Sequence, residues 1–271
     1  PCERKDRVDY VRSEHGYSLA RACKLMNLSR SVYYYKTQKD DTAVVEKLKQ
    51  LAEQYFDEGQ DKYCTRIKNE GIPWNHKRIR RVYRLMNLHH RRPHKKRIPA
   101  RVKEPLTVPV GPNETWSMDF MSDALSNGRR FRTLNILDDF NREALCIEPG
   151  FSIGAALVIK ALERLVLERA KPKTIRVDNG PEFIAHALQQ WSSENNITLL
   201  YIQPGRPMQN AFIERFNRSY RKRVLDAYLF ADLDQLRNLS QEFLQSYNHD
   251  RPHESLENMS PVEYRLKKQS A

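Results

Sequence analysis

Hydrophobic residues are spaced differently in the two parts of this 271-residue chain. Up to about residue 90, apolar residues recur at intervals of three and four, the period of an amphipathic helix. From residue 114 onwards, short apolar and β-branched runs typical of strands alternate with longer runs of helical period. The pattern therefore predicts an all-α region followed by an α/β region.

The first helical segments form a helix-turn-helix pattern. Apolar positions at helical spacing predict a helix over 18–26, and the turn at Asn27-Leu28 precedes Ser29, a candidate N-cap. A second short helix is expected over 30–36. A plain helical hairpin has the same pattern, because the motif has weak sequence specificity. We predict a helix-turn-helix-like module over residues 1–40.

A second helical unit is predicted over residues 41–90. A helix is expected over 44–56, and Asn75 is a candidate N-cap for a further helix. Leu-Met-Asn-Leu occurs in both units, at 25–28 and 85–88. Since the residues around the two copies differ, at most two related modules are expected and not a solenoid repeat.

Residues 91–113 are rich in proline and cations, and they predict a semi-extended linker. An α/β core is predicted over 114–230, followed by a C-terminal helical extension over 231–271. Strands are expected over 115–122, 130–138, 143–148, 174–178 and 197–202, and helices over 153–169, 183–195, around Glu214 and over 232–247. Three consecutive strands followed by alternating helices and strands fit a mixed five-stranded sheet flanked by helices.

Positive charge is concentrated in the helical region. The chain has 47 Lys and Arg against 34 Asp and Glu, and its pI of about 9.6 is typical of nucleic-acid-binding proteins. Residues 1–100 hold 24 Lys and Arg against 12 Asp and Glu, so the remainder is nearly neutral. No acid occurs between Glu70 and Glu104, which makes this the expected phosphate-contacting stretch. We predict that DNA is contacted by Lys77, Arg78, Arg81, Arg84, Arg91, Arg92, Lys95, Lys96 and Arg97.

Several other classes of protein are disfavoured. No apolar run approaches 18 residues and no signal-like segment is present, so a cytoplasmic protein without a membrane span is expected. The cysteines lack a C-x-x-C pair, which indicates reduced structural thiols at Cys2, Cys23, Cys64 and Cys146. Without paired cysteines, a basic DNA-facing surface is favoured over a zinc site for His76, His89, His90 and His94.

Three acids stand in distinctive sequence contexts. Asp119 lies in W-S-M-D-F, Asp178 in R-V-D-N-G-P-E-F and Glu214 in Q-N-A-F-I-E-R-F. Both aspartates fall within or at the end of predicted strands, and Asp178 directly precedes the Asn179-Gly180 turn signal. Carboxylate oxygens suit Mg²⁺ or Mn²⁺, and paired ions promote phosphoryl displacement. On spacing alone, ordinary surface acids are an equally good explanation.

The helix that carries Glu214 is predicted to be amphipathic. Asn210, Arg218 and Arg221 lie within about 40° of Glu214 around an ideal α-helix. The apolar residues on the opposite side are Phe212, Ile213, Phe216 and Tyr220. We therefore expect a core-anchored helix that presents Glu214 outward, with Asn210, Arg218 and Arg221 as candidate DNA contacts.

Other acids near the three compete for the metal. They are Asp123, Asp138, Asp139 and Glu182. We assign the Asp138-Asp139 doublet mainly to capping the turn between the second and third strands, with support of the metal site as the alternative. Trp116, three residues before Asp119, is expected in the core and not as a base-stacking surface.

Together these motifs resemble the D-D-E transposases and retroviral-type integrases. The resemblance rests on the three acids, the 35 residues between Asp178 and Glu214, and Arg221 seven positions after Glu214. It extends to the segment Y-N-H-D-R-P-H-E-S-L-E-N-M-S-P-V-E-Y at 247–264 and to the N-terminal modules. In particular, the chain is similar to the orfB product of the insertion-sequence-three group of bacterial mobile elements, over nearly its whole length. This resemblance implies a ribonuclease H-like core.

The resemblance also implies an activity and its partners. The implied protein is a transposase that uses two Mg²⁺ or Mn²⁺ ions, held by Asp119, Asp178 and Glu214, to cut DNA at terminal inverted repeats and to join the 3′-end to target DNA. A homo-oligomer on double-stranded DNA in the bacterial nucleoid, with an orfA partner or fusion, is also implied. A nuclease that cleaves without joining and an inactive DNA-binding regulator are rivals. The tandem helical modules disfavour the first and the intact acid triad disfavours the second.

Overall fold

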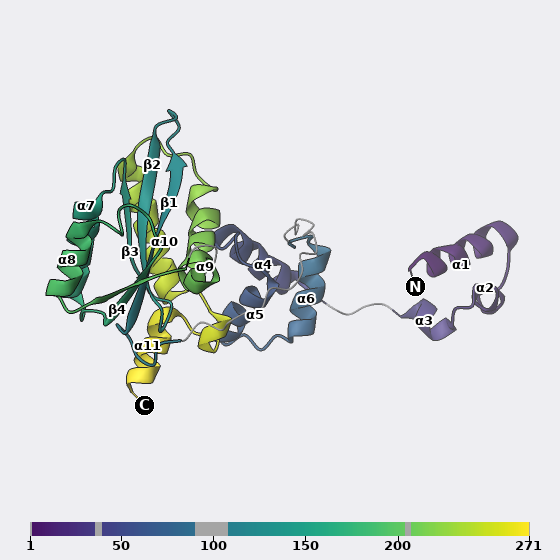
Figure 1. Ribbon diagram of the computed structural model, residues 1–271. Coiled ribbons are helices and arrows are strands. Elements are labelled where there is room, and N and C mark those ends of the chain that lie inside the picture. Colours follow the sequence, from purple (N-terminus) through teal and green to yellow (C-terminus); the bar gives the residue numbers. More distant parts are fainter. Residues whose placement is uncertain (1, 36–39, 90–107, 204–206, 271) are drawn as a thin grey trace. The chain divides into compact units, whose positions relative to one another are not determined.

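The computed structural model describes residues 2–35, 40–89, 108–203 and 207–270 (Figure 1). The chain divides into two units, Pro1–Lys47 and Leu48–Ala271. Most of the predicted linker lies outside the described residues, and so do Arg91, Arg92, Lys95, Lys96 and Arg97.

The N-terminal unit contains three short helices, α1 (Cys2–His15), α2 (Leu19–Leu25) and α3 (Arg30–Tyr34). The side chains of Ser18 and Ser29 accept backbone N–H groups at the starts of α2 and α3, so both helices begin with serine caps. A small core forms around the buried residues Val8, Ala22 and Cys23. The two predicted helices are present, and α1 is an additional helix.

Three further helices follow, α4 (Thr42–Gln54), α5 (Gln60–Asn69) and α6 (His76–Leu85). Asn75 caps α6 by accepting the backbone N–H of Lys77 at 2.9 Å, as predicted. The repeated Leu-Met-Asn-Leu acts as a helix stop, because its asparagines have positive φ angles of 48° at Asn27 and 54° at Asn87. The leucine after each asparagine then donates its N–H five residues back, to Cys23 and Tyr83.

A mixed five-stranded sheet forms the centre of the second unit. Its strands are β1 (Thr115–Ala124), β2 (Arg130–Asp138), β3 (Ala144–Gly150), β4 (Thr174–Val177) and β5 (Thr198–Tyr201). Their order is β3-β2-β1-β4-β5. The first three strands pair antiparallel, whereas β1, β4 and β5 pair parallel. The predicted sheet is confirmed, with strand boundaries within two residues of the expected ones.

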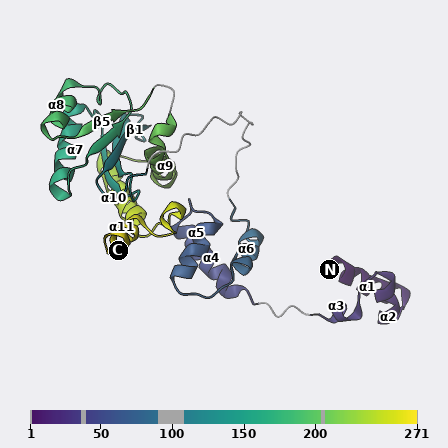
Figure 2. The same cartoon turned by 60° about the horizontal axis from the view of Figure 1, so that its bottom comes forward.

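Helices cover both faces of the sheet (Figures 1 and 2). On one face, α7 (Ala155–Glu168) and α8 (His186–Glu194) pack on a core that includes Trp116 and Met118. The other face is covered by α9 (Ala211–Tyr220) and α10 (Leu233–His249), whose core includes Met121 and Leu137. Short turns Pro207–Asn210, Arg221–Leu225 and Glu254–Leu256 and the C-terminal helix α11 (Pro261–Gln269) complete the unit. Trp116 is fully buried, as predicted.

The sheet face beneath α9 is partly polar. Since alternate residues of a strand face opposite ways, the side chains of Ser117 and Asp119 lie on the same face as Met121. Buried polar residues continue this patch on the neighbouring strands, at Thr133, Asn135 and Arg176. A buried polar patch in a sheet needs internal hydrogen-bond partners, so this is where a specialised site is expected.

The turn between α4 and α5 is fixed to the core by buried ion pairs. Asp57 is 2% exposed and accepts Arg223 at 3.0 Å and Arg251 at 2.7 Å. The two carboxylate oxygens of the adjacent Glu58 accept hydrogen bonds from Nε and Nη2 of Arg66 on α5, at 2.8 and 2.9 Å. One short segment thus joins the helices to two distant parts of the α/β core.

None of the described helices is both long and apolar enough to span a membrane. Cys23, Cys64 and Cys146 are free thiols, as expected.

Candidate active site

Asp119 lies in the middle of β1 with both carboxylate oxygens bonded. Oδ1 accepts the backbone N–H of Phe120 at 2.8 Å, and Oδ2 accepts the side-chain amide of Asn217 at 2.7 Å. Desolvation by burial is the main cause that raises the pKa of Asp119 to about 6, and the charges of Asp178 and Glu214 act in the same direction. The charges of Asp178 and Glu214 therefore reach the carboxylate of Asp119.

Asn217 is a site residue that sequence reasoning missed. Its Oδ1 accepts the amide of Asn135 at 2.7 Å while its Nδ2 donates to Asp119. Asn135 is the cross-strand partner of Asp119 on β2, so a buried chain of amides ties α9 to both strands. The only signal in the sequence is that Asn217 follows Glu214 by three residues, which places the two on neighbouring turns of one helix face.

Asp178 immediately follows β4, at the carboxyl end of the strand. Its Oδ1 accepts the backbone N–H of Gly180 at 3.0 Å, and Asn179 donates its side-chain amide to the carbonyl of Ile202 at 3.0 Å. A Cβ atom at position 180 would lie 3.0 Å from Oδ1 of Asp178, which explains the glycine. The Asn-Gly segment thus fixes this carboxylate at the edge of the sheet.

Glu214 projects from α9, which is anchored by its apolar side. Ile213, Phe216 and Tyr220 are buried against the sheet, as the amphipathic pattern predicts. Glu214 is half-buried, and desolvation raises its pKa above the usual value while Arg218 opposes the shift. The third acid is therefore held near the sheet by packing of the helix that carries it.

Regular helical geometry does not extend to Asn210 and Arg221. Asn210 ends a 3₁₀ turn, and Arg221 begins a π-helical turn. A rotation of about 100° per residue holds only within an α-helix, so it does not place either side chain on the same face as Glu214. Asn210 is 3% exposed and donates to the carbonyl of Met118 at 3.3 Å. Arg221 is paired with Asp123 at 3.1 Å. Arg218 is exposed. DNA contacts by Asn210, Arg218 and Arg221 stay predictions.

The chemistry of the cluster suits a hard divalent cation. Its donors are carboxylate oxygens, and a cation would relieve the repulsion that contributes to the raised pKa of Asp119. Two buried acceptors beside the acids, Asn210 Oδ1 and Glu182 Oε2, have no hydrogen-bond donor, and the water shell of a cation would supply one. Among the described residues, no three His, Cys, Asp or Glu side chains are arranged to hold a metal ion.

The acidic doublet divides into two roles. Asp138 accepts the backbone N–H of Phe140 at 2.9 Å, so it caps the turn after β2 as predicted. Asp139 instead points into the protein, where it accepts the hydroxyl of Ser117 and pairs with Arg176. Its partners belong to β1, which contains Asp119, and to β4, which Asp178 follows.

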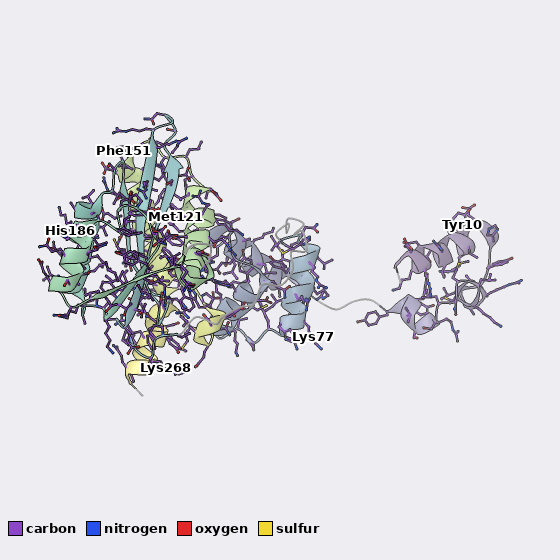
Figure 3. The ribbon with its side chains drawn as sticks, in the orientation of Figure 1. Tyr10, Lys77, Met121, Phe151, His186 and Lys268 are labelled. Carbon is purple, nitrogen blue, oxygen red and sulfur yellow. The ribbon has the colours of Figure 1, made fainter. Side chains whose placement is uncertain are left out.

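Four of the basic residues predicted to contact DNA lie on α6. Lys77 and Arg84 are exposed, with Lys77 in the first turn of the helix (Figure 3). Arg78 lies over the ring of Trp74 at 5.9 Å, and both Arg78 and Arg81 have interaction partners in the protein. The five basic residues from Arg91 to Arg97 are outside the described residues.

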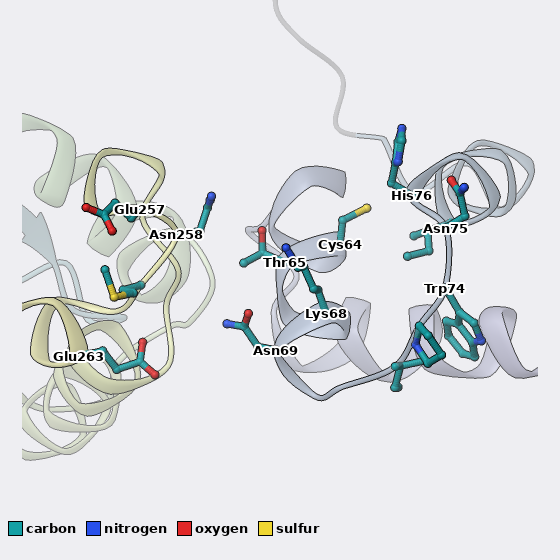
Figure 4. A pocket seen from close by; sticks show the side chains of 14 residues that line it. Cys64, Thr65, Lys68, Asn69, Trp74, Asn75, His76, Glu257, Asn258 and Glu263 are labelled. Atoms are coloured by element: carbon teal, nitrogen blue, oxygen red, sulfur yellow. The ribbon is translucent and has the colours of Figure 1, made fainter. Parts of the chain in front are cut away.

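A groove separates the α5–α6 region from the loop before α11 (Figure 4). Its walls mix charges of both signs and include Lys68, Trp74, His76, Glu257, Asn258 and Glu263. None of the three acids lines this groove, so it is separate from the acid cluster.

Two protein-family models match the chain, and both describe an "Integrase core domain". One matches residues 109–207 and the other residues 195–261. Both lie within the α/β region and its C-terminal helices, and together they include all three acids.

Similar proteins and structures agree with this match. The "Insertion element IS407 uncharacterized 31.7 kDa protein" of Burkholderia multivorans is 40% identical, over 95% of this chain and 94% of that protein. The "Putative transposase InsK for insertion sequence element IS150" of Escherichia coli is 23% identical, over 92% of this chain and 94% of that protein. The simian T-cell lymphotropic virus intasome structure, in complex with PP2A regulatory subunit B56 gamma, matches with a TM-score of 0.54 and 16% identity, over 80% and 73% of the two chains. The fold is therefore ribonuclease H-like, as predicted.

Proposed function

This chain belongs to the insertion-sequence transposases of the D-D-E type, which carry an integrase core domain, and we propose that Asp119, Asp178 and Glu214 are its catalytic carboxylates. The protein is a polynucleotidyl transferase that cleaves DNA and transfers the cut strand. The assignment is supported above all by the electrostatic effect on Asp119 of β1 of two other acids, Asp178 after β4 and Glu214 on α9.

The proposed reaction is two successive phosphoryl transfers. Water is the nucleophile in the first step and releases the 3′-hydroxyl of the element's end, and that hydroxyl attacks a phosphodiester of the target in the second. When bound, a pair of Mg²⁺ or Mn²⁺ ions activates the attacking oxygen and stabilises the leaving oxygen. No covalent bond to the protein is needed, so catalysis depends on positioning and charge.

The chain's own residues supply that positioning. Asn217 and the Phe120 N–H orient the carboxylate of Asp119, and the Gly180 N–H orients that of Asp178. Glu214 is carried by a helix whose other side is buried. Near pH 7.5, Asp119 is ionised despite its raised pKa of about 6, so it is available as an anionic ligand.

Recognition of the DNA ends is assigned to the helical modules, residues 1–40 and 41–90. We propose that they bind the terminal inverted repeats, with the basic residues of α6 on phosphates. The protein would act as a homo-oligomer, at least a dimer, because two ends must be joined to one target, and an orfA product would be its partner or fusion.

The test uses supercoiled donor DNA that carries the element's own ends, with Mg²⁺ present. The wild-type protein is expected to cleave and join. Asp178→Asn removes one anionic ligand without changing side-chain size, so both steps should slow by at least about a hundredfold while binding of the ends persists.

Asp234→Asn is the matched control. Asp234 is exposed on α10 and is paired with Arg237 of its own helix, so this variant should retain wild-type activity. Full joining by Asp178→Asn would refute the assignment of Asp178. Cleavage without joining by the wild type would identify a nuclease, and binding alone would identify a regulator.

A further inference from the structure

Asp139 is a fully buried carboxylate between the two central parallel strands. Its Oδ1 accepts the hydroxyl of Ser117 at 2.5 Å, and its Oδ2 accepts Nη1 of Arg176. Ser117 and Asp139 are 0% exposed and Arg176 is 7% exposed, so water does not compete for these bonds. The backbone N–H of Asp139 also donates to the carbonyl of Thr115 at 2.9 Å, which fixes the aspartate against β1.

The two partners of Asp139 have matching positions in the strands. Ser117 and Arg176 face each other in the parallel pairing of β1 with β4. Ser117 is two residues before Asp119, and Arg176 is two residues before Asp178. Because residues two apart in a strand lie on the same face, Ser117 lies next to Asp119 on one face of β1. Arg176 is the second-last residue of β4, the strand that Asp178 directly follows.

Turn formation does not account for Asp139. The neighbouring Asp138 already caps the turn, through the N–H of Phe140. A buried ion pair also contributes little net stability compared with apolar residues of similar size, because both charges lose their hydration. What such a pair does supply is a fixed geometry, since each charge requires its partner in one place.

We propose that Asp139 is a positioning residue for the active site. By binding Ser117 and Arg176 together, it holds the ends of β1 and β4 in one arrangement next to Asp119 and Asp178, and thereby limits how far the two carboxylates can shift relative to each other. The inference rests on the proposed function of those two acids. Loss of Asp139 is therefore expected to raise the divalent-cation concentration that cleavage requires, and this effect should exceed what a loss of stability alone produces.

The test compares Asp139→Asn with the wild type in two measurements. One is the Mn²⁺ concentration that gives half-maximal cleavage of the element's ends. The other is the rise in melting temperature on adding Mn²⁺ without DNA. Asparagine keeps the shape but leaves Arg176 without its anion, so the half-maximal concentration should increase about tenfold and the melting rise should shrink.

Glu143→Gln is the matched control. Glu143 lies at the end of the same turn, is 2% exposed and is paired with Arg169 at 2.6 Å and Arg265 at 3.0 Å. These partners lie at the end of α7 and on α11, not beneath the two aspartates. Glu143→Gln should lower the melting temperature without changing the Mn²⁺ requirement.

The double variant Asp139→Asn with Arg176→Met separates positioning from stability. Removing both charges should restore stability relative to Asp139→Asn, because Arg176 is no longer buried without its anion, yet the Mn²⁺ requirement should stay raised. Recovery of the wild-type requirement in the double variant would overturn the inference.

The remaining outcomes distinguish a failure of the Asp139 inference from a failure of the proposed function. If the wild type cleaves with Mn²⁺ and Asp139→Asn matches it at every Mn²⁺ concentration, the inference about Asp139 is wrong while the proposed function stands. The same holds if Glu143→Gln raises the Mn²⁺ requirement as much as Asp139→Asn does. Wild-type protein that shows neither cleavage nor a melting shift with Mn²⁺ overturns the proposed function and the inference together.

Discussion

Asn217 donates its amide to a carboxylate that is largely shielded from water. Asn217→Ala removes this donor from Asp119 and also leaves the amide of Asn135 without an acceptor. A hydrogen bond to a charged group contributes about 1.5–3 kcal/mol, so the cleavage rate should fall roughly tenfold to a hundredfold. The measurement is the single-turnover rate of end cleavage at saturating Mg²⁺.

Asn248→Ala serves as the comparison for Asn217→Ala. Asn248 is another buried amide, and it bonds the backbone N–H and carbonyl of Ala144, both at 2.8 Å. Its loss should lower stability but not the rate per folded molecule. Equal rates for the two variants would show that Asn217 acts only on the fold.

Asp119 should make the metal-free protein less stable at neutral pH. Its folded pKa of about 6 is above the ordinary 3.8, so folding favours the protonated form, and this stability is lost as the pH rises through 6. With EDTA present, Asp119→Asn should be more stable than the wild type by about 3 kcal/mol at pH 7.5, since one pKa unit corresponds to about 1.4 kcal/mol. The difference should be small near pH 4, where Asp119 is protonated in the folded state and roughly half protonated in the unfolded state.

Denaturant titrations at the two pH values measure this difference. A stability difference that is the same at pH 4 and pH 7.5 would mean that Asp119 is not desolvated as the structure indicates. Adding Mn²⁺ should stabilise the wild type and leave Asp119→Asn nearly unchanged, because only the wild type then gains an ion partner.

At the residue scale, sequence could identify the acids but not their supports. Asp178 stands in a rare context, at the end of a strand and before Asn-Gly, which is a local signal. Asn217 and Asp139 are ordinary polar residues in sequence, and their roles depend on partners 98 residues away for Asn217 and 37 residues away for Asp139. Only the packed fold brings such pairs together.

At the scale of elements, the α4–α5 turn should be essential for stability. Burial tends to raise the pKa of Asp57, but Arg251 and then Arg223 outweigh it and hold the pKa below 3.8. Asp57→Asn removes the anion from Arg223 and leaves Arg251 only its longer contact with Glu58 at 3.5 Å, so the free energy of unfolding at pH 7 should fall by about 3–5 kcal/mol. Chemical denaturation measures this, and Asp234→Asn on the exposed face of α10 should change it by less than about 0.5 kcal/mol.

The pH dependence of the Asp57 variant is a second check on the ion pairs. A carboxyl group with a depressed folded pKa stabilises above its unfolded pKa, and this stability is lost as the pH falls through the folded value. The difference between wild type and Asp57→Asn should therefore be full at pH 7 and shrink below pH 3.8. A difference that persists in acid would assign the effect to packing and not to charge.

Elements were predictable where one face is consistently apolar. All five strands satisfy this condition, and so does α9. α1 was missed because, among those of its residues whose side chains the structure describes, only Val8 is fully buried, which leaves almost no periodic signal. α5 was missed because it buries Arg66, and that burial is possible only with Glu58 as a partner. The 3₁₀ and π turns that flank α9 also leave no mark in a regular 3.6-residue pattern.

At the scale of the whole molecule, charge and chemistry are segregated along the chain. Residues 1–100 carry twice as many Lys and Arg as Asp and Glu, while the part that contains the three acids is nearly neutral. A nearly neutral catalytic region attracts DNA phosphates only weakly, so affinity should come from the basic helical modules. Binding should then depend steeply on salt, because each neutralised phosphate releases counterions.

Neutralising α6 tests this distribution of charge. Lys77→Gln and Arg84→Gln remove exposed charges, and each should weaken binding of all DNA sequences and reduce the slope of log affinity against log salt by about one. Lys160→Gln, an exposed change on α7 of the neutral region, is the control and should leave the slope unchanged. Fluorescence anisotropy over a range of salt concentrations measures the slope. If Lys160→Gln reduced it as much as the α6 variants do, DNA affinity would arise from the whole surface, and the helical modules would lose their assigned role.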